Sequence, residues 1–131
     1  MGDLSWLNDY IGLPYEFGGR SRSGLDCYGL PKLIYKEIYN IDLPDWIFDR
    51  VNLKEINGEI VGQVGSGRFT ETKEPENGCF VVCYRTRCAH HLGLFYGGGV
   101  IHCSRGLGVV YQPKARFEKD YVNVIYGEWN P

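Results

Sequence analysis

The spacing of apolar positions changes along the chain from a helical period to a strand period. Apolar side chains recur at helical spacing over residues 4–11 and again over residues 27–39. Asp26 stands directly before the second segment as a candidate N-cap. Pro31 fits only the first turn of a helix, so we expect this helix to begin late or with an irregular turn.

The second half of the chain has the alternating pattern of β-strands. Short β-type runs occupy residues 79–84, 91–96, 100–102, 109–111 and 122–126. The glycine-containing segments 97–99 and 105–108 are typical of hairpin turns. Helices followed by antiparallel strands predict an α+β fold. Residues 43–77 have a weaker pattern, with a candidate short helix near 46–50 and a glycine-rich patch at 62–67.

Length and composition predict one folded domain that spans residues 1–131. With 44% hydrophobic and 23% charged residues, the chain can bury a core without metal or disulfide support. A net charge of -2 gives no basic field for a nucleic-acid backbone, so we expect no nucleic-acid partner. The absence of a bilayer-length apolar stretch predicts no membrane insertion. The N-terminus has no signal-peptide pattern, which predicts synthesis in the cytoplasm.

The cysteines are odd in number, and this favours reduced thiols over a disulfide framework. The sequence has five of them. A zinc site built from Cys79, Cys83, Cys88 and Cys103 with His90 or His102 is an alternative. Its spacing is unfavourable, because Cys79 and Cys83 flank an apolar run that is typical of a strand and not of a zinc knuckle. We therefore expect no metal site and no cofactor.

Cys27 is the first candidate for chemistry, because it lies at the start of the second predicted helix. Unpaired N–H groups and the positive end of the helix dipole favour a thiolate there, and the thiolate is the nucleophilic form. The backbone N–H of Cys27 is also placed to stabilise an oxyanion beside the sulfur. A small buried helix residue is the alternative explanation for this cysteine.

A pair of histidines on neighbouring predicted strands is the second candidate. Successive strand residues face opposite sides, so His90 and His91 cannot serve the same site. His91 and His102 lie on strands joined by a tight glycine turn, and they can meet across that hairpin. One would act as a base and the other would hold its tautomer and orientation. Gln112 is a reserve candidate for the orienting role if His102 points away.

Four segments in this order resemble the NlpC/P60 family, and the resemblance extends from about residue 12 to residue 111. The segments are Pro14-Tyr15-x-x-Gly18-Gly19, Gly24-Leu25-Asp26-Cys27-x-Gly29-Leu30, His91-Leu92-Gly93-Leu94-Phe95 and Val100-Ile101-His102. The resemblance implies a papain-like α+β fold with the nucleophile helix packed on an antiparallel sheet. It also implies a cysteine peptidase that cleaves peptidoglycan stem peptides beside a γ-linked D-glutamate.

Carried onto this sequence, the resemblance assigns a role to each matching residue. Cys27 corresponds to the nucleophile, His91 to the general base and acid, and His102 to the third, orienting member. Tyr15 corresponds to the family tyrosine whose hydroxyl joins the oxyanion hole.

One departure from the family concerns the substrate side of the site. Tyr28 stands where the family commonly has serine after the nucleophile, so we expect it to affect which substrate binds. Cys27-Tyr28-Gly29 resembles the phage tail-associated branch, which implies a virion tail or the host cell envelope as the place of action and tail proteins as partners.

Three charged residues near Cys27 are candidate substrate contacts. Arg20 and Arg22 are placed to attract carboxylates of a stem peptide, although solvated loop arginines are the common alternative. Asp26 is a further candidate at the substrate-binding site, with helix capping as its first expected role.

Two other functional classes fit the same sequence. A tail component or peptide-binding protein on this fold would retain the pocket without turnover. A cysteine amidase or acyltransferase would keep the nucleophile and act on a substrate outside the cell wall. Thiol reactivity separates an enzyme from a binding protein, because an activated Cys27 reacts faster than buried cysteines.

Overall fold

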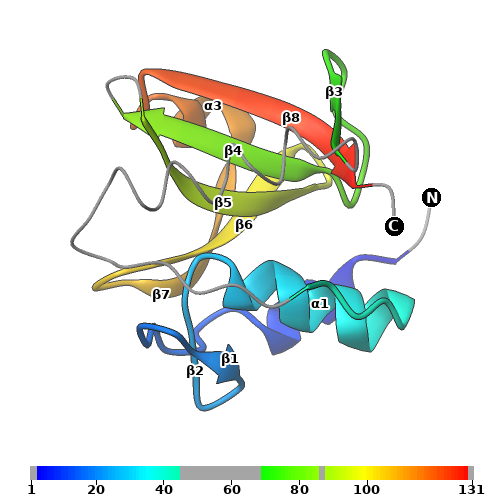
Figure 1. The fold of residues 1–131 in the computed structure, drawn as a ribbon, viewed down its shortest axis with the longest axis vertical. Coiled ribbons are helices and arrows are strands. Elements are labelled where there is room, and N and C mark those ends of the chain that lie inside the picture. The colour runs from blue at the N-terminus through cyan, green and yellow to red at the C-terminus, as the bar shows by residue number, and fades with distance from the viewer. Residues whose placement is uncertain (1–2, 45–68, 86–87, 130–131) are drawn as a thin grey trace.

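The computed structural model describes residues 3–44, 69–85 and 88–129. Its main feature is a six-stranded antiparallel sheet in the order β3-β8-β4-β5-β6-β7 (Figure 1). The strands are β3 (Phe69–Thr72), β4 (Phe80–Arg85), β5 (Cys88–Tyr96), β6 (Gly99–Ser104), β7 (Gly108–Pro113) and β8 (Asn123–Trp129). The N-terminal part contributes η1 (Ser5–Asp9), the small hairpin β1 (Arg20–Ser21) and β2 (Gly24–Leu25), and α1 (Gly29–Tyr39). A short helix, α3 (Lys114–Glu118), precedes β8.

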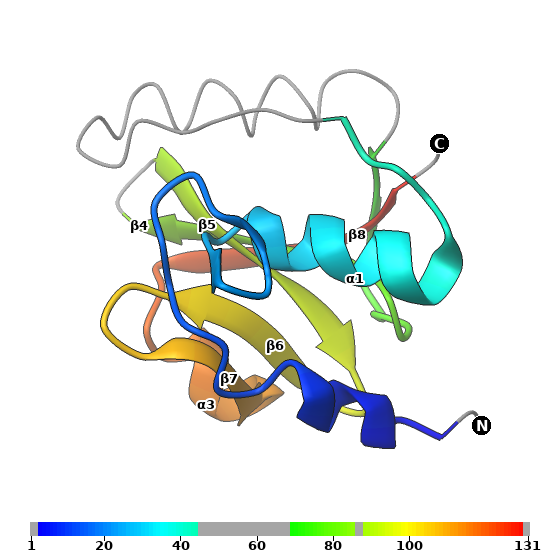
Figure 2. The ribbon, with the colours of Figure 1, turned by 90° about the horizontal axis from the view of Figure 1, so that it is seen from below.

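The sheet carries a separate apolar cluster on each face, as the alternation of strand side chains requires. On one face, α1 and η1 pack against the sheet through a cluster that includes Leu30, Ile34, Phe80, Leu94 and Ile101. On the opposite face, α3 inserts its buried Phe117 among the second set, Val81, Cys83, Phe95, Val100 and Tyr126. Figure 2 shows α1 and α3 on the two sides of the curved sheet. The α+β prediction is confirmed.

The helix that follows Cys27 begins late, as Pro31 predicts. Residues 27 and 28 form a turn, and α1 starts at Gly29, so that Pro31 lies in the first helical turn. The helix ends where Asn40 adopts a left-handed conformation with φ of 56°.

The first predicted helix is shorter and tighter than its periodicity indicates. It is a 3-10 helix over Ser5–Asp9, with i to i+3 bonds from Leu7 N–H to Leu4 O and from Tyr10 N–H to Leu7 O. Gly12 then turns away with φ of 95° and donates its N–H to Val109 O. This tertiary bond ties the chain to β7 directly after the short helix.

The five predicted strands in the second half are confirmed, with most of their bounds shifted by one to three residues. Gly97 and Gly98 form the β5–β6 turn with φ of 58° and 81°, values that favour glycine. The sequence analysis missed β1, β2, β3 and α3, which are too short to produce a clear period. The predicted helix near 46–50 and the glycine patch at 62–67 lie outside the described residues.

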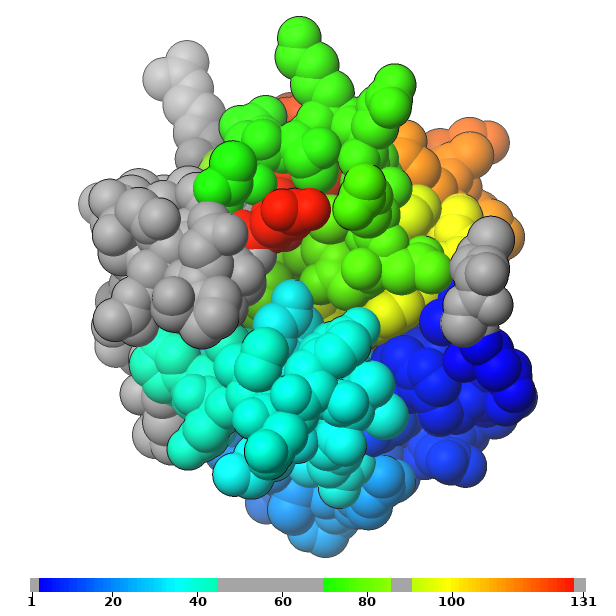
Figure 3. Space-filling model, turned by 90° about the vertical axis from the view of Figure 1, so that its right-hand side faces the viewer, coloured from blue at the N-terminus to red at the C-terminus, as the bar shows by residue number. Residues whose placement is uncertain are grey.

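The end of the molecule away from Cys27 contains a shallow hollow of about 260 Å³. It lies where the C-terminal end of α1 meets the start of β4 and the end of β8, with Tyr35, Tyr39 and Glu128 among its lining residues (Figure 3). Across the described part of the chain, no helix combines the length and apolar character needed to cross a bilayer.

Candidate active site

The cysteine side of the site is the connection between β2 and α1, where the Asp26 carboxylate organises the backbone. Oδ1 of Asp26 accepts the N–H of Tyr28 at 3.1 Å and the N–H of Gly29 at 2.7 Å. These bonds satisfy donors at the start of α1, so the predicted capping role of Asp26 is confirmed. In the described residues, the N–H of Cys27 itself donates to no protein acceptor. It is therefore available beside the sulfur.

The same carboxylate binds the preceding loop. Asp26 is 3% exposed, and it accepts Gly18 N–H at 3.2 Å and Nη1 of Arg20 at 2.7 Å. Arg20 also donates to Gly19 O at 2.8 Å, and its guanidinium lies 5.5 Å from the centre of the Tyr28 ring. The guanidinium predicted to attract substrate is thus engaged in fixing the loop around Cys27.

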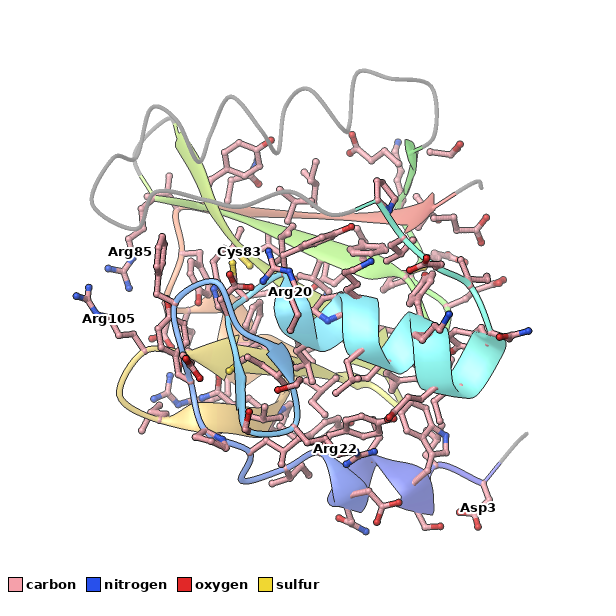
Figure 4. All side chains as sticks on the ribbon, turned by 60° about the horizontal axis from the view of Figure 1, so that its bottom comes forward. Asp3, Arg20, Arg22, Cys83, Arg85 and Arg105 are labelled. Atoms are coloured by element: carbon pink, nitrogen blue, oxygen red, sulfur yellow. The ribbon has the colours of Figure 1, made fainter. Side chains whose placement is uncertain are left out.

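The structure places two other predicted substrate residues away from an open surface at the thiol. Tyr28 is 2% exposed, and its hydroxyl donates to Pro44 O. Arg22 binds Glu37 at 2.6 Å and lies 4.8 Å from the centre of the Tyr10 ring. Figure 4 shows Arg22 beside η1, whereas Arg20 lies over the start of α1. Substrate contact by Tyr28, Arg20 and Arg22 stays a prediction.

The histidine side of the site is the β5–β6 hairpin, where His91 and His102 meet as the hairpin geometry predicts. Nε2 of His91 lies 2.9 Å from Nδ1 of His102, with the rings nearly perpendicular at 83°. The exposed fractions are 8% and 4%. Nε2 of His102 lies 2.8 Å from Oε1 of Gln112 on β7. His102 does not point away, so Gln112 adds to the pair and does not replace its second member.

Gly93 makes the meeting of the two histidines sterically possible. A Cβ at this position would lie 2.8 Å from Cγ1 of Val100, 3.0 Å from Ile101 O and 3.1 Å from Cβ of His102. The sequence analysis used Gly93 only as part of a motif. The close approach of β6 is the physical reason that this position of β5 is occupied by a glycine.

Aromatic residues that follow β7 cover the two histidine rings, and the sequence analysis missed them. The Phe117 ring lies 4.8 Å from the His102 ring, and the Tyr121 ring stacks on His91 at 6.0 Å with an interplanar angle of 12°. Phe117 and Tyr121 also contact each other at 5.0 Å between ring centres. The only sequence signal was two aromatic residues four positions apart after Pro113.

Cys27 approaches the histidine side where β5 and β6 separate. The two strands pair from Tyr96↔Gly99 to Leu94↔Ile101, and the ladder ends there. Beyond this point the backbone N–H of Leu92, the residue after His91, donates to the sulfur of Cys27. The sulfur also interacts electrostatically with Cys83, which pairs with His91 across β4 and β5. Figure 4 labels Cys83 near the start of α1.

Tyr15 borders Cys27 from the other side. A parallel bridge joins it to Leu25, fixed by Leu25 N–H to Pro14 O at 3.0 Å and Glu16 N–H to Leu25 O at 2.9 Å. Burial raises the pKa of Tyr15, and the neighbouring Cys27 raises it further. The phenol is therefore protonated at neutral pH and can donate a hydrogen bond near the sulfur.

Electrostatics at the site favour neutral groups. Burial raises the pKa of Cys27, and the Asp26 charge adds to this, whereas Leu92 N–H and Arg20 act in the opposite direction. Burial lowers the pKa of His102, partly offset by Gln112 and Asp120. The expectation that the helix start alone favours the Cys27 thiolate is wrong, because desolvation outweighs the nearby donors. A thiolate here requires a local acceptor for its proton.

The remaining described cysteines are buried free thiols. Cys79 accepts Glu76 N–H at 3.3 Å, and Cys103 donates to Leu25 O at 3.1 Å. Burial raises the pKa of Cys103 to about 12 and that of Cys83 well above its ordinary value. Among the side chains that the structure describes, no three metal-ligating groups gather, and those of His90 and Cys88 are not among them.

A cysteine that precedes a helix, facing a histidine pair on an antiparallel sheet, defines the papain-like α+β class. Solved structures share this fold. The NlpC/p60 domain of the peptidoglycan hydrolase SagA matches with a TM-score of 0.61 and 19% identity, over 92% of this chain and 90% of that domain. An NLP/P60 family protein similar to lipoprotein from Staphylococcus aureus matches with a TM-score of 0.62 and 20% identity, over 94% of this chain and 38% of that one.

The chain belongs to the NlpC/P60 family, whose pattern matches residues 12–125. The probable endopeptidase NlpC homolog of Haemophilus influenzae is 26% identical over 113 residues, which are 83% of this chain and 53% of that protein. The murein DD-endopeptidase MepH of Escherichia coli is 32% identical over 100 residues, or 73% of this chain and 32% of that protein. The chain thus spans about half the length of the first relative and a third of the second.

Proposed function

We propose that this chain is a cysteine endopeptidase that hydrolyses amide bonds of peptidoglycan stem peptides, with the γ-D-glutamyl linkage as the bond cleaved. The observation that carries the proposal is the hydrogen-bonded His91–His102 pair, set where Leu92 N–H binds the Cys27 sulfur. The names of the relatives, a murein DD-endopeptidase and a probable endopeptidase, support the substrate class.

In the proposed mechanism, Cys27 and His91 act as nucleophile and base. His91 takes the thiol proton as the sulfur bonds to the carbonyl carbon and the π electrons move to oxygen. His91 then donates that proton to the leaving amine, which leaves a thioester. Water attacks the thioester with His91 as base, and Cys27 regains its proton. His102 holds the His91 ring throughout, as its 2.9 Å contact allows.

The oxyanion is stabilised in this proposal by the Cys27 N–H and the Tyr15 hydroxyl. Tyr15 is close enough to Cys27 to interact with it electrostatically, and in the described residues the Cys27 N–H has no competing protein acceptor. One such donor is typically worth about 3 kcal/mol of barrier. Tyr15→Phe should therefore slow the reaction by about 10²-fold without abolishing it.

The cellular setting is a finer proposal. The segment Cys27-Tyr28-Gly29, which resembles the phage tail-associated branch, supports a virion tail-associated lysin that acts on the host envelope. A tail component that only binds peptide, or an acyl transfer to another acceptor, would be revealed by the experiment below.

The test is mass spectrometry of muropeptides incubated with the wild type and with two matched variants. Cys27→Ser replaces the nucleophile, and Cys79→Ser makes the same change at a buried thiol remote from the histidines. We expect new stem-peptide fragments with the wild type and Cys79→Ser, and a loss of at least about 10³-fold with Cys27→Ser. Fragments that persist with Cys27→Ser would overturn the nucleophile. If the wild type releases no fragments from peptidoglycan of any wall chemistry, the proposed substrate class is overturned.

A further inference from the structure

The contact between Gln112 and His102 continues the histidine pair into a chain of three side chains on three adjacent strands. The two links are short, at 2.9 Å between the imidazoles and 2.8 Å from His102 to the amide oxygen. His91 lies on β5, His102 on β6 and Gln112 on β7. One end of this series is His91, next to Leu92, whose N–H bonds to the Cys27 sulfur, and the other end is the partly exposed amide of Gln112.

We infer that Gln112 is a positioning residue that fixes the protonation pattern of both histidines and so makes His91 a base toward Cys27. This inference rests on the proposed role of His91 and Cys27. An amide oxygen only accepts hydrogen bonds, so Nε2 of His102 must carry the proton in the 2.8 Å contact.

The tautomer of His102 then determines the tautomer of His91. A neutral imidazole with its proton on Nε2 has an unprotonated Nδ1, so Nδ1 of His102 accepts from Nε2 of His91. His91 consequently carries its own proton on Nε2, and its Nδ1 is left as an acceptor. Burial lowers the pKa of His102, which favours the neutral ring that this scheme requires.

The reverse orientation of the amide would disable the site. If the amide nitrogen faced His102, Nε2 would accept, Nδ1 would donate, and Nδ1 of His91 would carry a proton. His91 could then not take the proton of Cys27, whose burial makes a local acceptor necessary. A hydrogen-bond acceptor at position 112 thus selects the tautomers in which both histidines carry the proton on Nε2 and His91 can take the proton of Cys27.

Other ionisable groups near the pair belong in any test of pH dependence. These groups interact with His91 or His102, or with the Tyr121 ring that covers His91. They come from β4, the cysteine side and the segment after α3, and they are Cys27, Cys83, Arg85, Asp120 and Tyr121. Substitution of Gln112 changes none of them directly.

Two variants of Gln112 separate the effect of its hydrogen bond to His102 from the effect of its side-chain shape. Gln112→Met keeps nearly the same length and removes a strong acceptor, whereas Gln112→Glu keeps an acceptor-only oxygen. Asn77→Leu is the matched control, because Asn77 accepts Gly97 N–H at 2.8 Å at the far end of the same hairpin. The full chain is used, and the probe is iodoacetamide reacting with Cys27, read site by site by mass spectrometry across pH 5–9.

We expect Gln112→Met to slow Cys27 alkylation at pH 7 at least tenfold and to move the midpoint of its pH profile upward. Gln112→Glu should stay within threefold of the wild type, and Asn77→Leu should not change the profile. An unchanged rate and midpoint in Gln112→Met would overturn the inference. Equal losses in both Gln112 variants, with a matching fall in Tm and no shift of midpoint, would also overturn it.

Nitrogen NMR of the histidine side chains gives a second readout that does not depend on reactivity. The sequence has three histidines, which makes assignment straightforward. We expect the proton on Nε2 in both His91 and His102, and a proton on Nδ1 of His102 would overturn the inference. Neither measurement uses a cell-wall substrate, so failure to cleave muropeptides would leave this result intact and reject only the proposed function.

Discussion

The cysteine side and the histidine side of the site are held in place by different forces. Around Cys27, one buried carboxylate gathers backbone N–H groups and Arg20 from residues within eight positions of it. Around His91 and His102, the partners come from β6, β7, α3 and the segment after α3, and they act through close approach and ring packing. Charge therefore governs the geometry of the cysteine side, and volume governs the histidine side.

Removal of the Asp26 charge should have the largest effect on stability. Asp26→Ala leaves Arg20 and three backbone donors without their acceptor, so we expect a loss of about 3 kcal/mol in the free energy of unfolding and loss of hydrolysis. Urea denaturation measures the first effect. Asp42→Ala, which removes an exposed ion pair with Lys32, is the control and should change little. Equal denaturation midpoints for the two variants would contradict a charge-organised cysteine side.

A single added methyl group should disturb the histidine side. Gly93→Ala places a carbon within 3.1 Å of His102 and nearer still to Val100, so we expect about 2 kcal/mol of destabilisation and more than tenfold slower hydrolysis. Gly98→Ala is the matched control. It strains a residue with φ of 81° by about 1 kcal/mol but meets no atom within 4 Å. If both variants hydrolyse substrate alike, volume does not govern the histidine side.

The aromatic cover should contribute a smaller amount. Tyr121→Leu removes the ring stacked on His91, and we expect about 1 kcal/mol of destabilisation with a few-fold fall in kcat. Tyr121→Phe keeps the ring and should retain most of both quantities. Thermal unfolding and kcat, measured on the same preparations, give the comparison. A larger loss in the Phe variant than in the Leu variant would assign the effect to the hydroxyl instead of the stack.

The smallest expected effect is a pH dependence of stability that comes from His102. Burial lowers its pKa, so below about pH 6.5 the unfolded chain binds a proton that the folded chain does not. This contribution destabilises the fold as pH falls through 6.5, and it is absent above that pH. Urea denaturation at pH 7.5 and 5.5 should show a smaller acid loss in His102→Asn than in the wild type. An equal loss would mean that other groups set the acid limit.

The predictions that succeeded were those supported by local chemistry or by a regular period. Asp26 before an apolar helical stretch identified its cap, and Pro31 indicated the late start of α1, because both depend on the backbone of a few neighbouring residues. The glycine turn at 97–98 brought His91 and His102 together through the fixed geometry of a hairpin. Motif order further identified the family that the comparisons support.

Failures occurred where distant residues decide the outcome. The ionisation of Cys27 was misjudged because its position at the helix start favours a thiolate, whereas burial by the folded chain, and then the Asp26 charge, raise the pKa of the thiol. The burial of the Tyr28 ring and the bond of its hydroxyl to Pro44 had no local signal, and its contact with substrate stays a prediction. The covering role of Tyr121 had no local signal beyond its spacing of four positions from Phe117.

By itself, the sequence determined the late start of the helix after Cys27, the paired histidines and the α+β class, because caps, turns and strand alternation act over a few residues. Only the folded chain fixed the alignment of Gln112 behind His102, the close strand approach at Gly93 and the neutral, desolvated state of the site. Each of these arises where strands far apart in sequence exclude water together, and solvent exclusion has no signature in a short stretch of residues.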